Sequence, residues 1–190
     1  IGECLGECHI LDTPQGREIA SKPHIVSDEL TNRTLIIAKE FKKSLEEMSI
    51  LDFSSCCILH ILRGSMGYMV HEAIPEVPLY NIRTKYLDEG YRDHSDDSRT
   101  LKVTYSDFQT EENYQAIIIP DTYATGRSVE AAVNHLLSEG YTPEHLVIYG
   151  FIAIPAIKRL FRLCQEKGIK LTSFAICDIT QLSTNNYDMP

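Results

Sequence analysis

The segment AIIIPDTYATGRS, residues 116–128, passes from an apolar run through one acidic residue into a Thr-Gly turn. The apolar run predicts a buried strand over residues 116–119, and the spacing of apolar positions after the turn predicts a helix over 128–138. A strand that leads through a short turn into a helix is the repeating unit of α/β proteins. The segment therefore indicates an α/β fold in which this turn lies at the carboxyl end of a strand.

The same alternation continues on both sides of the segment. Further strands are predicted over 56–62, 77–82, 146–151 and 171–177, and further helices over 28–48, 66–73 and 157–167. Strands separated by helices pair in parallel, and their helices cover both faces of the sheet. Because no repeat or linker interrupts the pattern, we expect residues 1–190 to form a single domain around a Rossmann-like open parallel sheet.

The composition is that of an ordinary folded domain, with 190 residues, 43% of them hydrophobic and 24% charged. A formal net charge of −9 opposes binding to nucleic-acid phosphates, so no DNA or RNA partner is expected. No membrane partner is expected either, because the longest nearly apolar stretch, 146–157, is shorter than the roughly 20 residues that a spanning helix needs.

The cysteines point to a reducing compartment. Four of the six lie in apolar runs typical of a core, and no secretory signal is recognised, so a cytoplasmic location is expected. Cys4, Cys8 and His9 cluster near the start of the chain, but no second pair of ligands follows at a zinc-like spacing. We therefore predict no metal held by protein ligands alone.

One polar, charge-dense segment, residues 84–112, breaks the alternation and contains a short candidate strand at 101–105. Segments of this length in a domain of this size are usually functional lids or disordered. We interpret it as a mobile arm beside the functional site, with a solvated insertion as the alternative.

The turn after residue 121 has the chemistry of a phosphate site. Its successive backbone N–H groups and the hydroxyls of Thr125 and Ser128 lie at the positive end of the following helix. Asp121 precedes the turn and can accept hydrogen bonds from sugar hydroxyls, which favours a phosphorylated sugar over an inorganic anion. The plainer alternative is that Asp121 and Thr125 only cap the helix.

On these residues the segment resembles the loop with which type I phosphoribosyltransferases bind phosphoribosyl diphosphate (PRPP). The resemblance implies the fold of that family and carries over a set of binding residues: Asp121, Thr122, Tyr123, Ala124, Thr125, Gly126, Arg127 and Ser128. One feature departs from the pattern, because family members carry an acidic residue at the position of Pro120 or at both Pro120 and Asp121. Phosphate binding by 124–128 is thus better supported than ribose recognition by two acids.

A second segment, residues 57–69, ends a strand at Arg63 and Gly64 and resembles the diphosphate loop of uracil phosphoribosyltransferases. By that resemblance Arg63 clamps the diphosphate through charge-assisted bonds, the Gly64 backbone contributes to the same loop, and Arg83 also reaches the diphosphate. Arg83 is equally well explained as a surface arginine at the end of a strand. Base recognition is expected near or beyond the C-terminus, where Tyr187, like Tyr123 in the loop, is either a ring-packing or a core residue.

The resemblance implies transfer of ribose 5-phosphate from PRPP to a nucleobase, first of all uracil, with release of diphosphate. Arg63 and Asp121 are the residues expected to act on the reacting groups. Mg²⁺ is the implied cofactor, held mainly by PRPP oxygens and water, and a homodimer is expected. Three alternatives stay open: another base such as orotate, a purine or xanthine; a non-catalytic PRPP or nucleotide sensor of the same fold; and an unrelated phosphosugar-binding domain.

Overall fold

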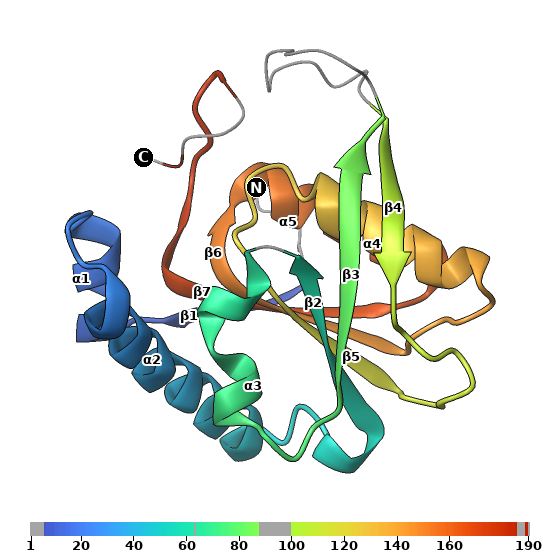
Figure 1. Cartoon of the computed structure of the whole chain (residues 1–190), viewed down its shortest axis with the longest axis horizontal. Coiled ribbons are helices and arrows are strands. Elements are labelled where there is room, and N and C mark those ends of the chain that lie inside the picture. The colour runs from blue at the N-terminus through green and yellow to red at the C-terminus, as the bar shows by residue number, and fades with distance from the viewer. Residues whose placement is uncertain (1–5, 63, 88–99, 186–188, 190) are drawn as a thin grey trace.

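A computed structural model of the chain describes residues 6–62, 64–87, 100–185 and 189. Within these ranges the strands form one seven-stranded sheet in the order β1-β7-β6-β5-β2-β3-β4 (Figure 1). All neighbouring strands pair in parallel except β3 and β4, which are antiparallel. The strands are β1 Glu7–Leu11, β2 Cys56–Leu62, β3 Leu79–Tyr86, β4 Leu101–Ser106, β5 Ala116–Pro120, β6 His145–Ala153 and β7 Lys170–Thr180.

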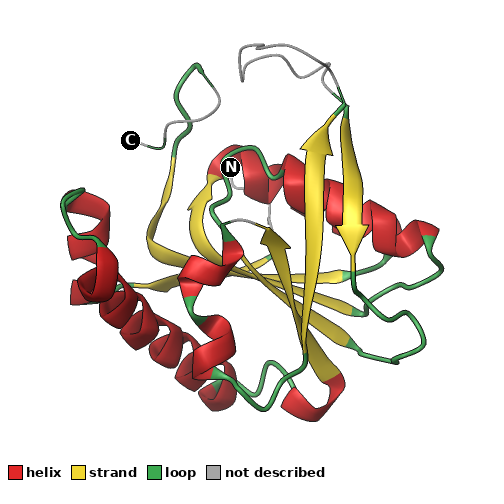
Figure 2. Cartoon of the chain, in the orientation of Figure 1, coloured by secondary structure: helices red, strands yellow, loops and turns green. Residues whose placement is uncertain are grey.

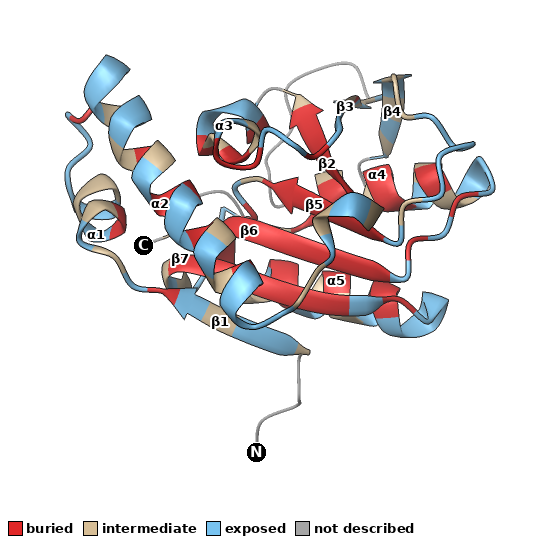
Figure 3. Ribbon diagram, turned by 90° about the horizontal axis from the view of Figure 1, so that it is seen from below, coloured by how far each residue is buried: buried red, intermediate tan, exposed pale blue. Residues whose placement is uncertain are grey.

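Helices lie on both faces of the sheet (Figure 2). They are α1 Pro14–Ser21, α2 Ser27–Glu47, α3 Val70–Ala73, α4 Arg127–Ser138 and α5 Ile154–Lys167, with short 3₁₀ turns η1 Phe53–Ser55 and η2 Ser65–Tyr68. Alternate residues of the central strands face opposite layers: Ile58 packs with α2 and α3, whereas Leu59 packs with α4 and α5. The central strands are accordingly buried on both faces (Figure 3), which explains their near-continuous apolar sequences.

The strand order reverses between β2 and β5. From β2 the chain steps to β3 on one side, and from β5 it steps through β6 to β7 on the other. Open α/β sheets bind ligands in the crevice at the carboxyl ends of the two strands where this reversal occurs. The fold thus places the loops after Leu62 and after Pro120 beside one another.

These findings confirm the expected α/β fold with an open, mostly parallel sheet and helices on both faces. Two details differ from the prediction. The helix expected over 66–73 is divided into η2 and α3 by Met69, whose φ is +54°. The strand expected over 77–82 begins at Leu79 and continues to Tyr86 because it pairs with β4 beyond the end of β2.

Sequence patterns missed β1 and α1 altogether. The burial pattern of β1 is mostly exposed or intermediate, because it is an edge strand of the sheet, so its sequence has no apolar run. Helix α1 is short and begins at a Thr13 cap, whose hydroxyl accepts a 3.0 Å hydrogen bond from the Gly16 N–H. Strand β1 forms by pairing with β7, a long-range contact that a periodicity argument does not test.

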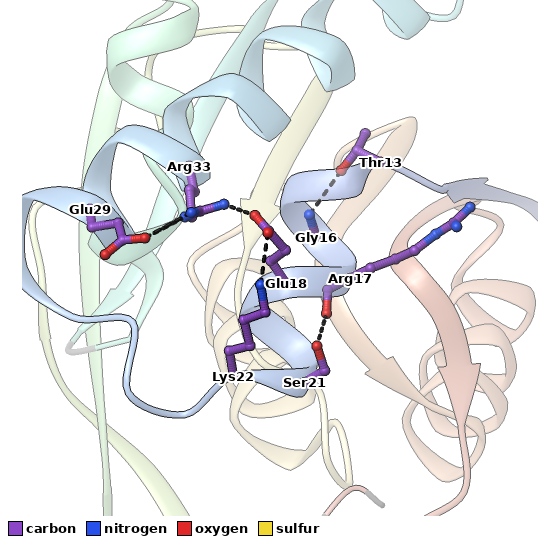
Figure 4. A network of polar contacts seen from close by, with 8 residues as sticks. All are labelled: Thr13, Gly16, Arg17, Glu18, Ser21, Lys22, Glu29 and Arg33. Carbon is purple, nitrogen blue, oxygen red and sulfur yellow. Dashed lines mark hydrogen bonds and ion pairs between the residues drawn. The ribbon is translucent and has the colours of Figure 1, made fainter.

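Helix α1 is fixed beside β7 by close packing and by charge. A Cβ on Gly16 would lie 2.9 Å from Ile176 Cγ2, so only glycine lets the helix approach this closely. Figure 4 shows the polar contacts on its exposed side, where Glu18 pairs with Arg33 of α2 and, at 2.9 Å, with Lys22. Arg33 also contacts Glu29 at 2.7 Å.

The expected arm is in part a β-hairpin. β3 and β4 extend together beyond the ends of β2 and β5 (Figure 1), and residues 88–99 at their tip lie outside the described residues. After β4, Phe108 packs with Tyr80 and Tyr141 on the α4 side. The mobility of the arm stays a prediction. Among the described residues, no helix is both long and apolar enough to cross a membrane.

Substitution of Gly150 tests how much the close approach of β6 to the end of β5 contributes to stability. Its φ is +151°, and a Cβ at this position would lie 1.8 Å from the Asp121 carbonyl oxygen. Gly150→Ala should therefore lower the free energy of unfolding by more than about 3 kcal/mol, because two adjacent strands must separate. Gly168→Ala is the matched control: its φ is +69° but nothing lies within 4 Å of the added Cβ, so it should cost about 1–2 kcal/mol. Equal losses in chemical denaturation would contradict the steric argument.

Candidate functional site

The carboxyl ends of β2 and β5 meet at Gly64 and Asp121. A Cβ on Gly64 would lie 2.9 Å from Asp121 Oδ1, so the carboxyl group lies directly against the Gly64 backbone. Ser65 holds this loop back on β2, because its buried hydroxyl accepts a 2.7 Å hydrogen bond from the Ile61 N–H and donates one to the Ile61 carbonyl. Arg63, which was expected to act here, lies outside the described residues.

Asp121 is a single half-buried acid held in a defined orientation. Its N–H donates to the Tyr149 carbonyl at 3.0 Å, and its Oδ1 accepts a 2.8 Å hydrogen bond from the Thr122 N–H. Desolvation by the surrounding chain raises the pKa of its carboxyl group to about 7, against the smaller opposing effect of the Thr122 hydrogen bond. Pro120 beside it is the buried last residue of β5 and supplies no second acid.

The turn after Asp121 opens onto a pocket of about 180 Å³ lined by Tyr86 and residues 121–129. Gly126 has a φ of +76° and forms the N-cap of α4, where no side chain caps the first turn. This arrangement leaves the first N–H groups of α4 beside the pocket, with the positive end of the helix dipole. Residues 121–128 of the predicted set thus line one turn at the start of α4, and anion binding there stays a prediction.

Two tyrosines hold the turn after Asp121 in place through hydrogen bonds. Tyr68 of η2 makes a 2.6 Å hydroxyl–hydroxyl hydrogen bond with Thr122, so the Thr122 side chain bridges the loops after β2 and β5. The Tyr123 N–H donates to the Phe151 carbonyl at 2.8 Å, and its hydroxyl donates to the Ile119 carbonyl. With 1% exposure, the Tyr123 ring belongs to the core, one of the two roles left open by the sequence. Tyr187, the second candidate, lies outside the described residues.

Tyr86 is a pocket residue that the sequence analysis missed. The Arg127 guanidinium carbon lies 5.8 Å from the centroid of the Tyr86 ring, so the base of the β3–β4 hairpin contacts the start of α4. The alternation of Ile82, Thr84 and Tyr86 on one face of the strand could have predicted the position of Tyr86, but the predicted strand ended at Ile82.

Arg83 lies beside the end of β2. It is exposed, pairs in register with Leu62, and lines an open cavity of about 580 Å³ with Leu62, Thr84, Lys85 and Thr104. The pairing brings two cations, Arg83 and Lys85, next to the loop that contains Gly64. This is the placement that a ligand anion would need, although Arg83 makes no described contact with Asp121 or with the turn.

A second, more apolar pocket of about 300 Å³ lies at the carboxyl ends of β6 and β7. Its walls come from α1, β6, β7 and the C-terminal segment: Ile19, Ala20, Phe151, Ile152, Ile176, Cys177, Asp178, Thr180 and Met189. It adjoins the turn after Asp121 because Ile152 forms a parallel bridge with Tyr123. Among the described residues that line it, Asp178 is the one charged side chain, and it is exposed.

The described residues contain no group of three or more His, Cys, Asp or Glu side chains that could hold a metal ion. Cys8 is exposed, and His9 instead pairs with Glu7 at 3.0 Å and stacks on Phe174. Asp121 alone fits a hard cation that keeps most of its ligands from a bound phosphate ester and water.

Fold and site together define an α/β protein in which the start of α4 faces a pocket at the switch point of the sheet. No protein-family model and no curated protein matches the chain. Among solved structures, the AQ2163 protein from Aquifex aeolicus is similar at a TM-score of 0.68 and 14% identity, over 95% of this chain and 91% of that one. Adenine phosphoribosyltransferase from Leishmania donovani is similar at 0.54 and 14% identity, over 95% and 87%. The enzyme from Leishmania tarentolae is similar at 0.51 and 14% identity, over 83% and 77%. The chain therefore has the fold of these phosphoribosyltransferases.

Two glycines of the same loop test whether the Gly64 contact shapes the site. Gly64→Ala should weaken binding of ribose 5-phosphate by about tenfold, because a clash of this kind costs ~1–3 kcal/mol and displaces the Asp121 carboxyl group. Gly67→Ala is the control, since nothing lies within 4 Å of its added Cβ. Titration calorimetry of both variants gives the comparison, and similar affinities would show that the contact is irrelevant to binding.

The raised pKa of Asp121 predicts a pH dependence of stability. From pH 4 to about 7 the folded protein keeps a proton that the unfolded chain, with an ordinary Asp pKa of 3.8, has lost. The contribution of Asp121 to stability therefore falls as pH rises through this window and is constant above it. Asp121→Asn keeps an oxygen for the Thr122 N–H but removes the titration, so its stability relative to wild type should increase between pH 5 and 7. A difference independent of pH in urea denaturation would refute the assignment.

Proposed function

We propose that this protein transfers ribose 5-phosphate from PRPP to a ring nitrogen of a nucleobase and releases diphosphate. One observation supports this most strongly: the Asp121 carboxyl group and the anion-binding turn of 124–128 lie side by side at the switch point, in a fold shared with adenine phosphoribosyltransferases. A phosphorylated sugar needs both an anion site and a hydroxyl acceptor, a few ångströms apart.

In this proposal each part of PRPP has a partner. The N–H groups of residues 126–128 and the hydroxyls of Thr125 and Ser128 bind the 5-phosphate. Asp121, when ionised, accepts hydrogen bonds from the ribose hydroxyls. The Gly64 backbone and the cations Arg63 and Arg83 bind the diphosphate, on which negative charge grows as it leaves.

Mg²⁺ bound to the PRPP oxygens would neutralise part of the diphosphate charge. Asp121 is the described carboxylate that would help to hold the ion. Binding of the 5-phosphate, away from the reacting carbon, supplies energy that orients the anomeric carbon. This orientation comes from the turn and does not require the metal ion.

The apolar pocket between α1 and the ends of β6 and β7 is the proposed acceptor site. Its aliphatic walls suit a flat ring, and Asp178 and Thr180 offer polar groups at its edge. Uracil is the first acceptor we propose, from the resemblance of the loop at 63–64. Adenine is the second, since adenine phosphoribosyltransferases share the fold. A homodimer, implied by the resemblance, and a cytoplasmic location, expected from the cysteines, remain predictions.

A sensor that binds PRPP or a nucleotide without turnover is the second candidate function. Pro120 stands where an acid is expected, and the remaining acid has a pKa near 7, so ribose recognition is weaker than with two ionised carboxylates. Such a protein would keep the phosphate turn and the acceptor pocket.

Calorimetric titration with PRPP and Mg²⁺, followed by release of diphosphate with uracil, adenine and other free bases, distinguishes the candidates. Asp121→Asn should weaken PRPP binding by roughly 1.5–3 kcal/mol, because charge-assisted hydrogen bonds to ribose are lost. Asp178→Asn is the matched control: it removes an acid from the acceptor pocket and should leave PRPP affinity unchanged while altering the KM for the base. PRPP binding without turnover on any base would favour the sensor, and absence of PRPP binding would rule out both.

A further inference from the structure

Arg159 of α5 contacts the phosphate turn from behind. Its Nε donates to the Thr125 carbonyl at 2.9 Å, and its Nη1 donates to Glu130 Oε2 at 2.8 Å. Arg159 is absent from the walls of the phosphate pocket and instead lines a separate cavity between α4 and α5. It therefore touches the turn without facing the ligand.

The contact with Thr125 orients a neighbouring donor. In a planar trans peptide the C=O and the following N–H point in opposite directions. A Thr125 carbonyl held toward α5 thus turns the Gly126 N–H away from α5. Helix α5 also supports the turn at Ala156, three residues before Arg159 and on the same helix face, since a Cβ on Gly126 would come within 3.2 Å of the Ala156 Cα.

The contact with Glu130 removes an unfavourable charge. Glu130 lies in the first turn of α4, and its N–H donates to the Gly126 carbonyl at 3.0 Å. An unpaired carboxylate there would repel an anion bound at the start of the helix. The ion pair with Arg159 is only about one-third exposed on each side, so it holds the carboxylate against α5.

We infer that Arg159 is a positioning residue for the phosphate site: it orients the Gly126 N–H toward the ligand and neutralises Glu130. The inference rests on the proposed function, because it assumes that the turn binds the phosphate of a sugar phosphate. It assigns a role in binding to a side chain that no ligand contacts.

Ribose 5-phosphate is the probe, titrated into wild type and four variants by calorimetry. Arg159→Gln should lower its affinity by about tenfold, because one orienting hydrogen bond and one charge are lost together. Glu130→Gln should bind as well as wild type or better. The double variant should recover the part of the loss due to charge and not the part due to orientation. Arg162→Gln, in the same outer cavity but without a bond to the turn, should bind like wild type.

The Gly126 amide resonance provides a readout that a purely structural role would not move. It should shift when ribose 5-phosphate binds to wild type, and shift much less in Arg159→Gln at saturation. If Arg159→Gln does not fold, Arg159→Lys serves in the same test, because it keeps the charge but lacks the forked donors. An affinity of Arg159→Lys below that of wild type supports the role of Arg159, because a surface residue without that role would leave the affinity unchanged.

The outcomes separate the two levels of the argument. If wild type binds ribose 5-phosphate and both Arg159→Gln and Arg159→Lys bind it with the affinity of wild type, the role of Arg159 is overturned and the proposed function stands. Full recovery in the double variant overturns the orienting part alone. Failure of wild type to bind ribose 5-phosphate overturns the proposed function, and this inference with it.

Discussion

The carbonyl oxygen of Asp121 occupies the space that a side chain on Gly150 would need, and the Asp121 carboxyl group occupies the space that a side chain on Gly64 would need. Three strands, β2, β5 and β6, converge on this one residue. Because Gly64 and Gly150 have no side chains, the Asp121 N–H can donate to the Tyr149 carbonyl of β6 while the Asp121 carboxyl group contacts the loop after β2. The positions of the turn and of the pocket that it lines follow from this approach.

The electrostatics of the site follow from the same geometry. Enclosure between the loops raises the pKa of the Asp121 carboxyl group to about 7, and Pro120 leaves it without a second acid. An anion bound at the start of α4 therefore meets backbone dipoles and little opposing negative charge, since Glu130 is paired with Arg159. In a chain whose formal net charge is −9, this local balance makes the turn suitable for phosphate.

Sequence similarity and structural similarity carry different weight here. The resemblance of the loops at 63–64 and 121–128 suggested a chemistry, and the likeness to solved adenine phosphoribosyltransferases establishes the fold. This chain combines one acid, a turn contacted by Arg159 of α5, and an apolar pocket lined in part by α1. A transferase and a sensor would share the first two features and differ in what the third one does.

The sequence by itself determined the alternation of strands and helices, the burial of the central strands and the turn that leads from Pro120 into a helix, because these depend on local periodicity and turn chemistry. Only the tertiary structure decided the rest. The edge strand β1 depends on pairing with β7, helix α1 packs against β7 at Gly16, and Tyr86 enters the pocket because β3 continues along β4. Arg159 reaches Thr125 because α4 and α5 pack on the same face of the sheet. Contacts between residues distant in the chain leave no periodic signal, so they become visible only when the strands are assembled.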